Sequence, residues 1–466
     1  MAIDELHKAW AKLDQLERQE RYLVERLSHI HKEIGAQKLE IDDLIKGRPP
    51  AINRLPTELL SQIFALCIPD SKFPGKPLHR IVSVSRRWRD VVWGDPSFWT
   101  SIKVTPTQDK KLLKKQLKRS RKALLDIWIA DWDDHRVYDA YDKLCALLGA
   151  IVPHANRWRS LIISESMDLE FMEPILMKMN HLSIPFLREF SINITDDLDY
   201  PDMPCPDFLS PTCAPALEYL TLKPSFQLDN FTALLALKVL HLTFPYADDP
   251  PPVISMLTPA QSLISLVLDG GSTGWSFKQN DLYCPLLEKL TLYVDEPVPF
   301  LAAIVAPKLR YVECRILDPV EFDTIEGKFR DVHDLSLISS YQAEGRSREP
   351  LCRAFPGVRR VHVAVWDASF LMTGIDGSGV LGERPLVDQW LNLETVIVES
   401  LHRGWLELWE LGDDPIVKWL RGRQESGLSR LRVRLSPVHA GEDKLSIYYA
   451  LLGKHCNLEI FNYPTQ

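Results

Sequence analysis

The first part of the chain carries a heptad pattern of apolar residues. Residues 3–46 contain no proline and a single glycine, Gly35, which favours one long helix. Apolar side chains recur at two places in each heptad, the a and d positions of a coiled coil. They are Leu6, Ala9, Leu13, Leu16, Leu23, Leu27, Ile30, Ile34, Ile41 and Leu44, with Glu20 and Gln37 as the polar exceptions. The pattern predicts a coiled-coil helix over residues 1–46. Its seam pairs with a partner helix, with a second copy, or with another part of the same chain.

A second pattern, over residues 50–104, predicts short amphipathic helices. Pro56 suits the first position of a helix. The apolar residues that follow it at helical spacing are Leu59, Leu60, Ile63, Phe64 and Cys67. A second helix is predicted from the spacing of Leu78, Ile81, Val84, Trp88 and Val91. About fifty residues cannot bury this many apolar side chains alone, so these helices need a partner surface.

The order of these residues resembles an F-box. The Leu55-Pro56 pair, the apolar helix ending at Ile63-Phe64, the segment Val82–Trp88 and the closing Trp99 follow the family pattern. The resemblance implies a three-helix module that docks on the Skp-type adaptor of a cullin–RING ubiquitin ligase. The adaptor contacts that it implies are Leu55, Pro56, Leu59, Leu60, Ile63, Phe64, Val84 and Trp88. Some of these must hold the module together instead, Trp88 first among them.

Residues 105–466 repeat a short apolar frame at positions i, i+3 and i+5. The frame begins at Leu187, Leu217, Leu237, Leu263, Leu287, Leu309, Val358, Leu393 and Leu428. The first six of these segments follow one another at intervals along the sequence that are close to the ~20–29 residues of a leucine-rich repeat. Each unit is expected to supply one strand to a parallel sheet, in sequence order, with a return segment behind it. The expected apolar ladder consists of Leu220, Leu240, Leu266 and Leu290.

This region resembles divergent leucine-rich repeats behind an F-box, a pairing familiar in fungal F-box proteins. Together the patterns predict an α/β chain made of a long N-terminal helix, a three-helix F-box and a leucine-rich-repeat-like solenoid with a parallel sheet. The basic run Lys110–Lys122 is expected to form an amphipathic helix with Leu112, Leu113 and Leu117 inward. The alternative interpretation of this run is a nuclear-localisation patch.

Composition narrows the class of protein. The 466 residues carry a formal charge of −8, which argues against a general nucleic-acid binder. The eight cysteines form no Cys-x-x-Cys pair and no zinc-like spacing, so we expect a reducing compartment and no metal. No apolar run is long enough to cross a membrane, and the N-terminus lacks the pattern of a signal peptide. We therefore expect an intracellular protein, cytoplasmic or nuclear.

One glycine motif is a candidate for enzyme chemistry. Gly377–Gly382 matches the dinucleotide fingerprint Gly-x-Gly-x-x-Gly, but no predicted strand directly precedes it, so an insertion loop is the better interpretation. With no catalytic constellation, the expectation is a non-enzymatic protein without a cofactor. The sequence predicts a substrate-recognition subunit of a Skp–cullin–F-box ubiquitin ligase, with an unknown target protein on the repeat region. The alternative is a non-catalytic coiled-coil and repeat scaffold outside ubiquitin transfer.

Overall fold

The chain divides into two compact units, Met1–Phe98 and Trp99–Gln466. The computed structural model describes residues 2–47, 51–68, 75–132, 140–164, 171–193, 203–223, 226–227, 235–244, 253–272, 274–316, 322–339, 349–364, 372, 385–401, 414–437 and 442–461. The glycine motif Gly377–Gly382 lies outside these residues. None of the described helices is long and apolar enough to cross a membrane.

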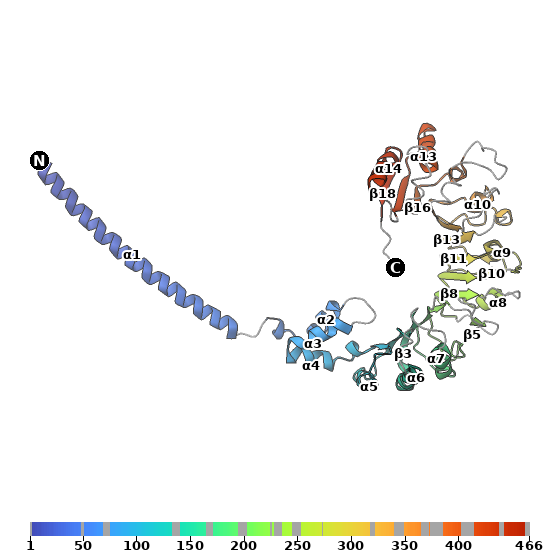
Figure 1. Ribbon diagram of the computed structural model, residues 1–466, viewed down its shortest axis with the longest axis horizontal. Helices are drawn as coiled ribbons and strands as arrows, with labels where there is room; N and C mark the ends of the chain where they lie inside the picture. The colour runs from blue at the N-terminus through green and yellow to red at the C-terminus, as the bar shows by residue number, and fades with distance from the viewer. Residues whose placement is uncertain are drawn as a thin grey trace. The chain divides into compact units, whose positions relative to one another are not determined.

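The first unit begins with the predicted long helix, α1, which runs from Ala2 to Gly47 (Figure 1). Asp4 and Glu5 in its first turn complement the positive end of the helix dipole. Every described side chain from residue 4 to residue 44 is exposed, including the apolar seam. No described part of the chain therefore covers the seam, which gives no support to the alternative that the helix packs on its own chain.

The rest of the first unit consists of short helices. They are η1 (Ala51–Arg54), α2 (Thr57–Cys67), α3 (Gly75–Val84), α4 (Arg86–Gly94) and η2 (Pro96–Trp99). The single helix expected from Leu78 to Val91 is wrong, because Ser85 separates α3 from α4. Ser85 has an extended backbone, and its hydroxyl accepts a 3.2 Å hydrogen bond from the Trp88 N–H, which makes it the N-cap of α4.

The second unit is built on one parallel sheet of 14 strands within the described residues. Its strands are β1 (Ser101–Val104), β2 (Leu125–Ile129), β3 (Trp158–Ile163), β4 (Glu189–Ile192), β6 (Tyr219–Leu222), β8 (Val239–Phe244), β9 (Ser265–Gly270), β11 (Lys289–Val294), β13 (Tyr311–Ile316), β14 (Asp334–Ser339), β15 (Arg360–Ala364), β16 (Thr395–Leu401), β17 (Arg432–Pro437) and β18 (Asn457–Ile460). Neighbours in the sheet follow the order of the sequence (Figure 1), so the predicted parallel sheet and its strand order are confirmed. Two small parallel pairs accompany it: β5 (Met203–Pro204) with β7 (Phe226–Gln227), and β10 (Leu282–Tyr283) with β12 (Ile304–Val305).

The predicted leucine ladder lies at the centre of this sheet. Leu220 pairs with Leu240, Leu240 with Leu266, and Leu266 with Leu290. All four side chains are fully buried. Successive strands therefore stack their apolar frames in register, which confirms the ladder and explains why no single unit has to bury its own face.

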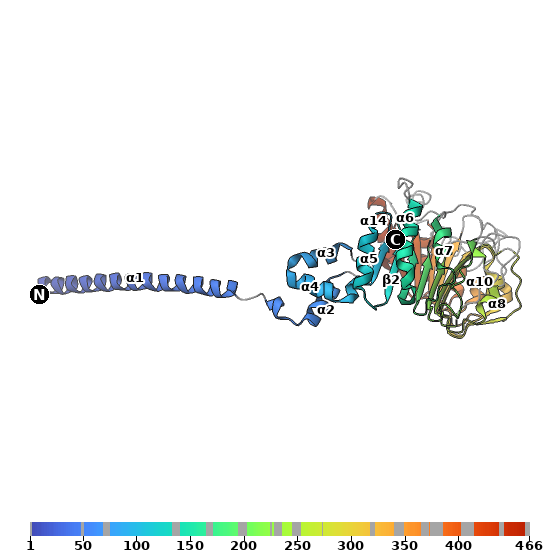
Figure 2. The same ribbon diagram turned by 90° about the horizontal axis from the view of Figure 1, so that it is seen from below.

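Connecting segments cover one face of the sheet and complete the core (Figure 2). The helices among them are α5 (Lys110–Arg119), α6 (Ala140–Ile151), η3 (Val152–Arg157), α7 (Met172–Met179), α8 (Val253–Leu257), α9 (Pro297–Ala303), η5 (Phe322–Ile325), α10 (Glu349–Ala354), η6 (Leu386–Gln389), α13 (Pro415–Glu425) and α14 (Glu442–His455). Leu113 and Leu117 of α5 are buried as expected. Leu112 is 57% exposed, so its predicted inward position is wrong.

Candidate functional site

The apolar residues that α2, α3 and the start of the module leave at the surface are the candidate docking residues, and this set is named here the docking edge. Leu59 is 45% exposed and Val84 is 60% exposed. Pro56 is exposed, whereas Leu55 and Ile63 are half-buried. Exposed apolar side chains of this size favour contact with another protein, because binding would remove them from water.

Leu60 and Phe64 have a different environment from their neighbours on α2. Both are buried, at 0% and 1% exposure, and therefore belong to the core of the module. The half-buried Trp88 of α4 packs its ring on that of Phe64, with the ring centroids 4.7 Å apart. These three predicted contact residues thus have a structural role, as expected for Trp88. The exposed positions Pro56, Leu59 and Val84 remain the available part of the predicted contact set.

Polar contacts fix α2 against α4. The Arg87 guanidinium of α4 donates a 2.5 Å hydrogen bond to the carbonyl of Leu55, just before α2 begins. At the other end of α4, the Ser61 hydroxyl donates to the Asp95 carboxylate. Asp95 also accepts a 2.9 Å hydrogen bond from the Ser97 N–H, which starts η2. Both ends of α4 are therefore bonded to the first half of α2 and to the residue before Pro56, which limits how α2, and Leu59 with it, can turn against α4.

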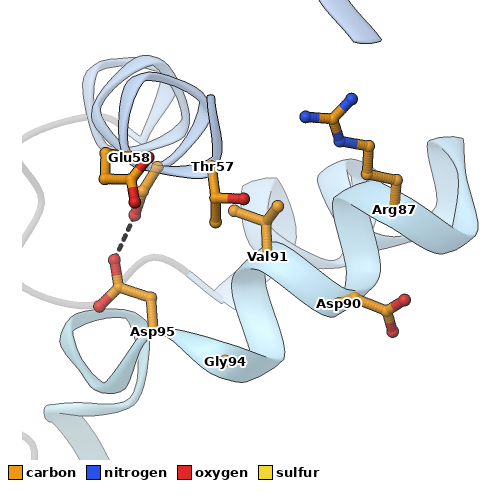
Figure 3. Close-up of a pocket in the computed structure, with 8 residues that line it drawn as sticks. Thr57, Glu58, Arg87, Asp90, Val91, Gly94 and Asp95 are labelled. Atoms are coloured by element: carbon orange, nitrogen blue, oxygen red, sulfur yellow. Dashed lines mark hydrogen bonds between the residues drawn. The ribbon is translucent and has the colours of Figure 1, made fainter. Parts of the chain in front are cut away.

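A hollow of about 550 Å³ lies beside these contacts (Figure 3). Its lining residues come from α2 and α4 and from Asp95: Thr57, Glu58, Ser61, Arg87, Asp90, Val91, Gly94 and Asp95. The Ser61–Asp95 hydrogen bond crosses one side of the hollow. Since small-molecule sites are concave and largely enclosed, whereas this hollow is open to solvent, we interpret it as the groove between two packed helices.

Two exposed apolar residues were not predicted as part of the site. Leu66 of α2 is 86% exposed and Trp93 of α4 is 45% exposed. The Arg89 guanidinium lies 5.7 Å from the centre of the Trp93 ring, a cation–π arrangement. Leu66 and Trp93 each follow an apolar run in the sequence. Helical spacing places each of them outside the inward face of its helix, and this spacing is the sequence signal that could have predicted their exposure.

The second unit presents a polar surface on the side of the sheet away from the connecting helices, named here the open face. Its central row, with one side chain per strand from β1 to β17, consists of Lys103, Trp128, Ile162, Ser191, Thr221, His241, Val267, Thr291, Glu313, Ser336, His362, Ile397 and Arg434. Most of these residues are half-exposed, while their neighbours along each strand are buried. The alternation of polar and apolar residues in the strands is the sequence signal for this face.

Hydrogen bonds and an ion pair connect the open face across β11 to β16. Glu313 accepts hydrogen bonds from the Tyr311 hydroxyl at 2.9 Å and from the Thr291 hydroxyl at 3.3 Å. Nε2 of His362 lies 2.8 Å from the Glu399 carboxylate, a contact that becomes an ion pair when the imidazole is protonated. These contacts order the polar side chains, and an ordered polar face suits the recognition of a protein surface.

Burial changes the acid–base behaviour of the open face. It lowers the pKa of His241 to about 4, and the nearby Lys223 charge acts in the same direction. Burial also raises the pKa of Asp269, against the opposing effects of Arg315 and Lys223. The Tyr311 pKa is raised as well, first by burial and then by the Glu313 charge. His241 is therefore neutral at physiological pH and offers hydrogen-bonding nitrogens instead of a charge.

The described residues contain no cluster of His, Cys, Asp or Glu that could hold a metal ion. None of the eight cysteines, each within the described ranges, forms a disulfide bond. Burial raises the pKa of Cys284 to about 11, and burial together with Asp207 raises that of Cys205 to about 12. These two thiols are therefore poor nucleophiles, because the thiolate is the reactive form.

Comparison with known proteins gives a match that begins in the first unit and ends at the start of the second. The family model described as F-box-like matches residues 52–105. The match covers α2, α3, α4 and β1, and it includes the Leu59 edge and the Phe64–Trp88 contact. No curated protein matches the chain. The chain therefore carries an F-box-like domain behind a long N-terminal helix and ahead of a large parallel sheet.

Proposed function

We propose that this protein is a substrate-recognition subunit of a Skp–cullin–F-box ubiquitin ligase. The observation that carries the proposal is the F-box-like domain at residues 52–105, since F-box domains in general bind Skp-type adaptors. The exposed Pro56, Leu59 and Val84 supply an apolar edge for that contact. In this role the protein is not an enzyme and needs no cofactor, and it acts inside the cell, in the cytoplasm or the nucleus.

The proposed mechanism is positioning. The F-box-like domain holds the adaptor and, through it, a cullin that carries the ubiquitin-conjugating machinery. A target protein bound elsewhere on the chain is then held near activated ubiquitin. Holding two reactants together raises their effective concentration, which accelerates transfer without a catalytic group on the receptor.

The second unit is the proposed target-binding part, as a leucine-rich-repeat-like solenoid. Its stacked parallel strands support this interpretation, and so do the ordered polar side chains of the open face. Glu313, for example, is held by hydrogen bonds from the hydroxyls of Tyr311 and Thr291. Side chains that are already held in place lose little further freedom when a target protein binds.

Adaptor binding by the purified full chain tests the proposal. We expect Leu59→Asp to abolish co-purification with a Skp-type adaptor, because a carboxylate in an apolar interface is costly. The matched control is Ala65→Asp, which places the same charge at an exposed position of the same helix, α2, about 120° around the helix from Leu59. Full binding by a folded Leu59→Asp protein would refute the proposed edge.

Cullin recruitment separates the ligase from the alternative of a scaffold outside ubiquitin transfer. The exposed seam of α1 is what favours a scaffold, because it offers a further association surface. We expect the adaptor complex to recruit a cullin and to support ubiquitin transfer to a bound target. Adaptor binding without a cullin would favour the scaffold.

A further inference from the structure

The apolar seam of α1 is exposed along its whole described length. The leucines and isoleucines of the seam from Leu6 to Leu44 are each 44–60% exposed. A continuous apolar stripe on one long helix is stable in water when a second helix covers it. What distinguishes this seam is its two polar positions, Glu20 at an a position and Gln37 at a d position.

We infer that α1 pairs with α1 of a second copy of this chain in the antiparallel direction, with Glu20 opposite Gln37 of the other copy. The inference rests on α1 alone and does not depend on the proposed ligase function. It follows from which residues each direction of pairing brings face to face.

A parallel pair in register places identical residues opposite each other. Glu20 would then face Glu20 of the second copy inside an apolar seam. Two carboxylates that face each other across the seam repel, and the leucines and isoleucines of the neighbouring layers provide no hydrogen-bond donor to compensate. The parallel arrangement therefore places a like-charge contact in the middle of the helix.

An antiparallel pair brings a positions opposite d positions. When Glu20 faces Gln37 of the second copy, every other layer of the overlap is apolar on both sides. The remaining pairs are Leu13 with Leu44, Leu16 with Ile41, Leu23 with Ile34 and Leu27 with Ile30. Both polar positions of the seam are thus matched by one register.

The chemistry of the matched polar pair is favourable. Gln37 donates a 3.0 Å hydrogen bond from its amide nitrogen to Glu40 of its own helix. A side-chain amide carries two N–H donors, so Gln37 has a second hydrogen for the carboxylate of Glu20. The carboxylate of Glu20 then gains a donor, which a facing Glu20 carboxylate in a parallel pair could not supply.

The charges beside the seam also suit this register. Arg26 would lie near Glu33 of the second copy, and Glu17 near Lys38, so both flanks gain opposite-charge neighbours. A parallel pair has favourable flanking charges too, with Lys12 near Glu17 and Glu33 near Lys38. The flanks are therefore compatible with either direction, and the decisive difference is the Glu20 contact.

Antiparallel pairing would have a consequence for the assembled protein. The helices of the two copies would end at opposite ends of the coil, about 55 Å apart at 1.5 Å per residue. The chain would then leave each α1 towards its F-box-like domain at a separate end of the coil, and the dimer would carry two copies of each unit. Such an arrangement would let one dimer engage two sites of a repetitive or dimeric target, which increases apparent affinity through effective concentration.

Disulfide trapping in the full-length protein tests the direction of pairing. Leu16→Cys and Ile41→Cys are made separately, and each variant is oxidised alone and mixed with the other. We expect a disulfide between the two substituted positions only in the mixture, identified by peptide mass spectrometry against the background of the native thiols. A disulfide that joins two copies of the same variant through its substituted position, in either separate sample, would overturn the antiparallel arrangement. A wild-type protein that is monomeric by light scattering at all concentrations would overturn pairing with a second copy.

Charge variants at Gln37 give an independent test, because their effects have opposite signs. Gln37→Lys would face Glu20 of the second copy, so the dimer should tighten by about tenfold, summed over its two such layers. Gln37→Glu would face the same carboxylate, so the dimer should weaken by a similar factor. In a parallel pair both variants would place like charges opposite each other, so weakening by both variants would refute the inference.

Discussion

The rings of Phe64 on α2 and Trp88 on α4 lie 4.7 Å apart between centroids, tilted by 48°. This contact joins the helix that follows the Leu55-Pro56 pair to the helix that carries the Arg86-Arg87-Trp88 motif. Phe64 is 1% exposed, so the contact is made inside the module and not at its surface. The residues that define the F-box resemblance therefore divide into a buried set that holds the helices together and an exposed set available to a partner.

This division predicts different consequences for two substitutions on the same helix. Phe64→Ala should destabilise the first unit by about 3–5 kcal/mol, because it removes a buried aromatic side chain and leaves a cavity. Leu59→Ala should change stability by less than about 1 kcal/mol, since this side chain is 45% exposed, but it should weaken adaptor binding. Hydrogen exchange of α2 and α4 measures the first effect and adaptor titration the second. Equal protection in both variants would show that Phe64 is not a core residue.

The leucine ladder predicts a large effect in the second unit. Leu266 is fully buried between Leu240 and Leu290 on the neighbouring strands. Leu266→Ala should cost about 2–5 kcal/mol of unfolding free energy, as for a well-packed core leucine. Leu391→Ala is the matched control, because Leu391 is 92% exposed and should contribute within about 0.5 kcal/mol. Urea unfolding of both variants decides the matter, and similar midpoints would contradict the stacked core.

The apolar frame at i, i+3 and i+5 was sufficient to predict most of the sheet, because each strand must place the same side of its backbone on the core. β3 and β14 follow the same frame, with Trp158 and Val332 at its first position, and were nevertheless not predicted. That position requires a large apolar side chain and not leucine as such. β18 was missed for a different reason. It is an edge strand whose Asn457, Glu459 and Ile460 are exposed, so it has no clear apolar alternation.

The candidate site was harder to predict than the fold. Leu59 and Leu60 are adjacent on α2, and the helical spacing places both on one broad apolar face. Which of the two is buried depends on where α4 packs, and that position is fixed by the Arg87–Leu55 and Ser61–Asp95 hydrogen bonds. Contacts between residues this far apart in sequence carry no signal in the local pattern. The polar residues of the open face were not predicted either, because they come together only when the strands are in register.

The half-buried imidazole of His241 predicts a pH dependence of stability. Its pKa falls from 6.5 to about 4 in the folded protein, so the unfolded chain binds more protons between these values. Stability should therefore be fully present above about pH 6.5 and should be lost as the pH falls towards 4. The contribution of this residue is at most about 3 kcal/mol. Urea unfolding at a series of pH values should show a smaller loss in His241→Gln than in the wild type. If His241→Gln loses as much stability at low pH as the wild type does, His241 is excluded as a source of the pH dependence.

The last prediction concerns Gly270, where β9 ends beside the end of β8. Gly270 has a φ of 98°, a conformation that glycine adopts readily and other residues rarely do. A Cβ atom here would lie 2.1 Å from the carbonyl oxygen of Phe244, its register partner on β8. That oxygen accepts a 3.3 Å hydrogen bond from the Gly271 N–H, which ties the two strand ends together.

Gly270→Ala should therefore destabilise the second unit by about 2–5 kcal/mol, from backbone strain and the clash together. The control is Gly149→Ala in α6, where a Cβ would meet no atom within 4 Å. In a helix that substitution should be neutral or stabilising by up to about 1 kcal/mol, because alanine loses less backbone entropy than glycine. Thermal unfolding should give a lower midpoint for Gly270→Ala than for the wild type, and an unchanged or higher midpoint for Gly149→Ala. If Gly270→Ala has the wild-type midpoint, the close approach of β8 and β9 at this point is wrong.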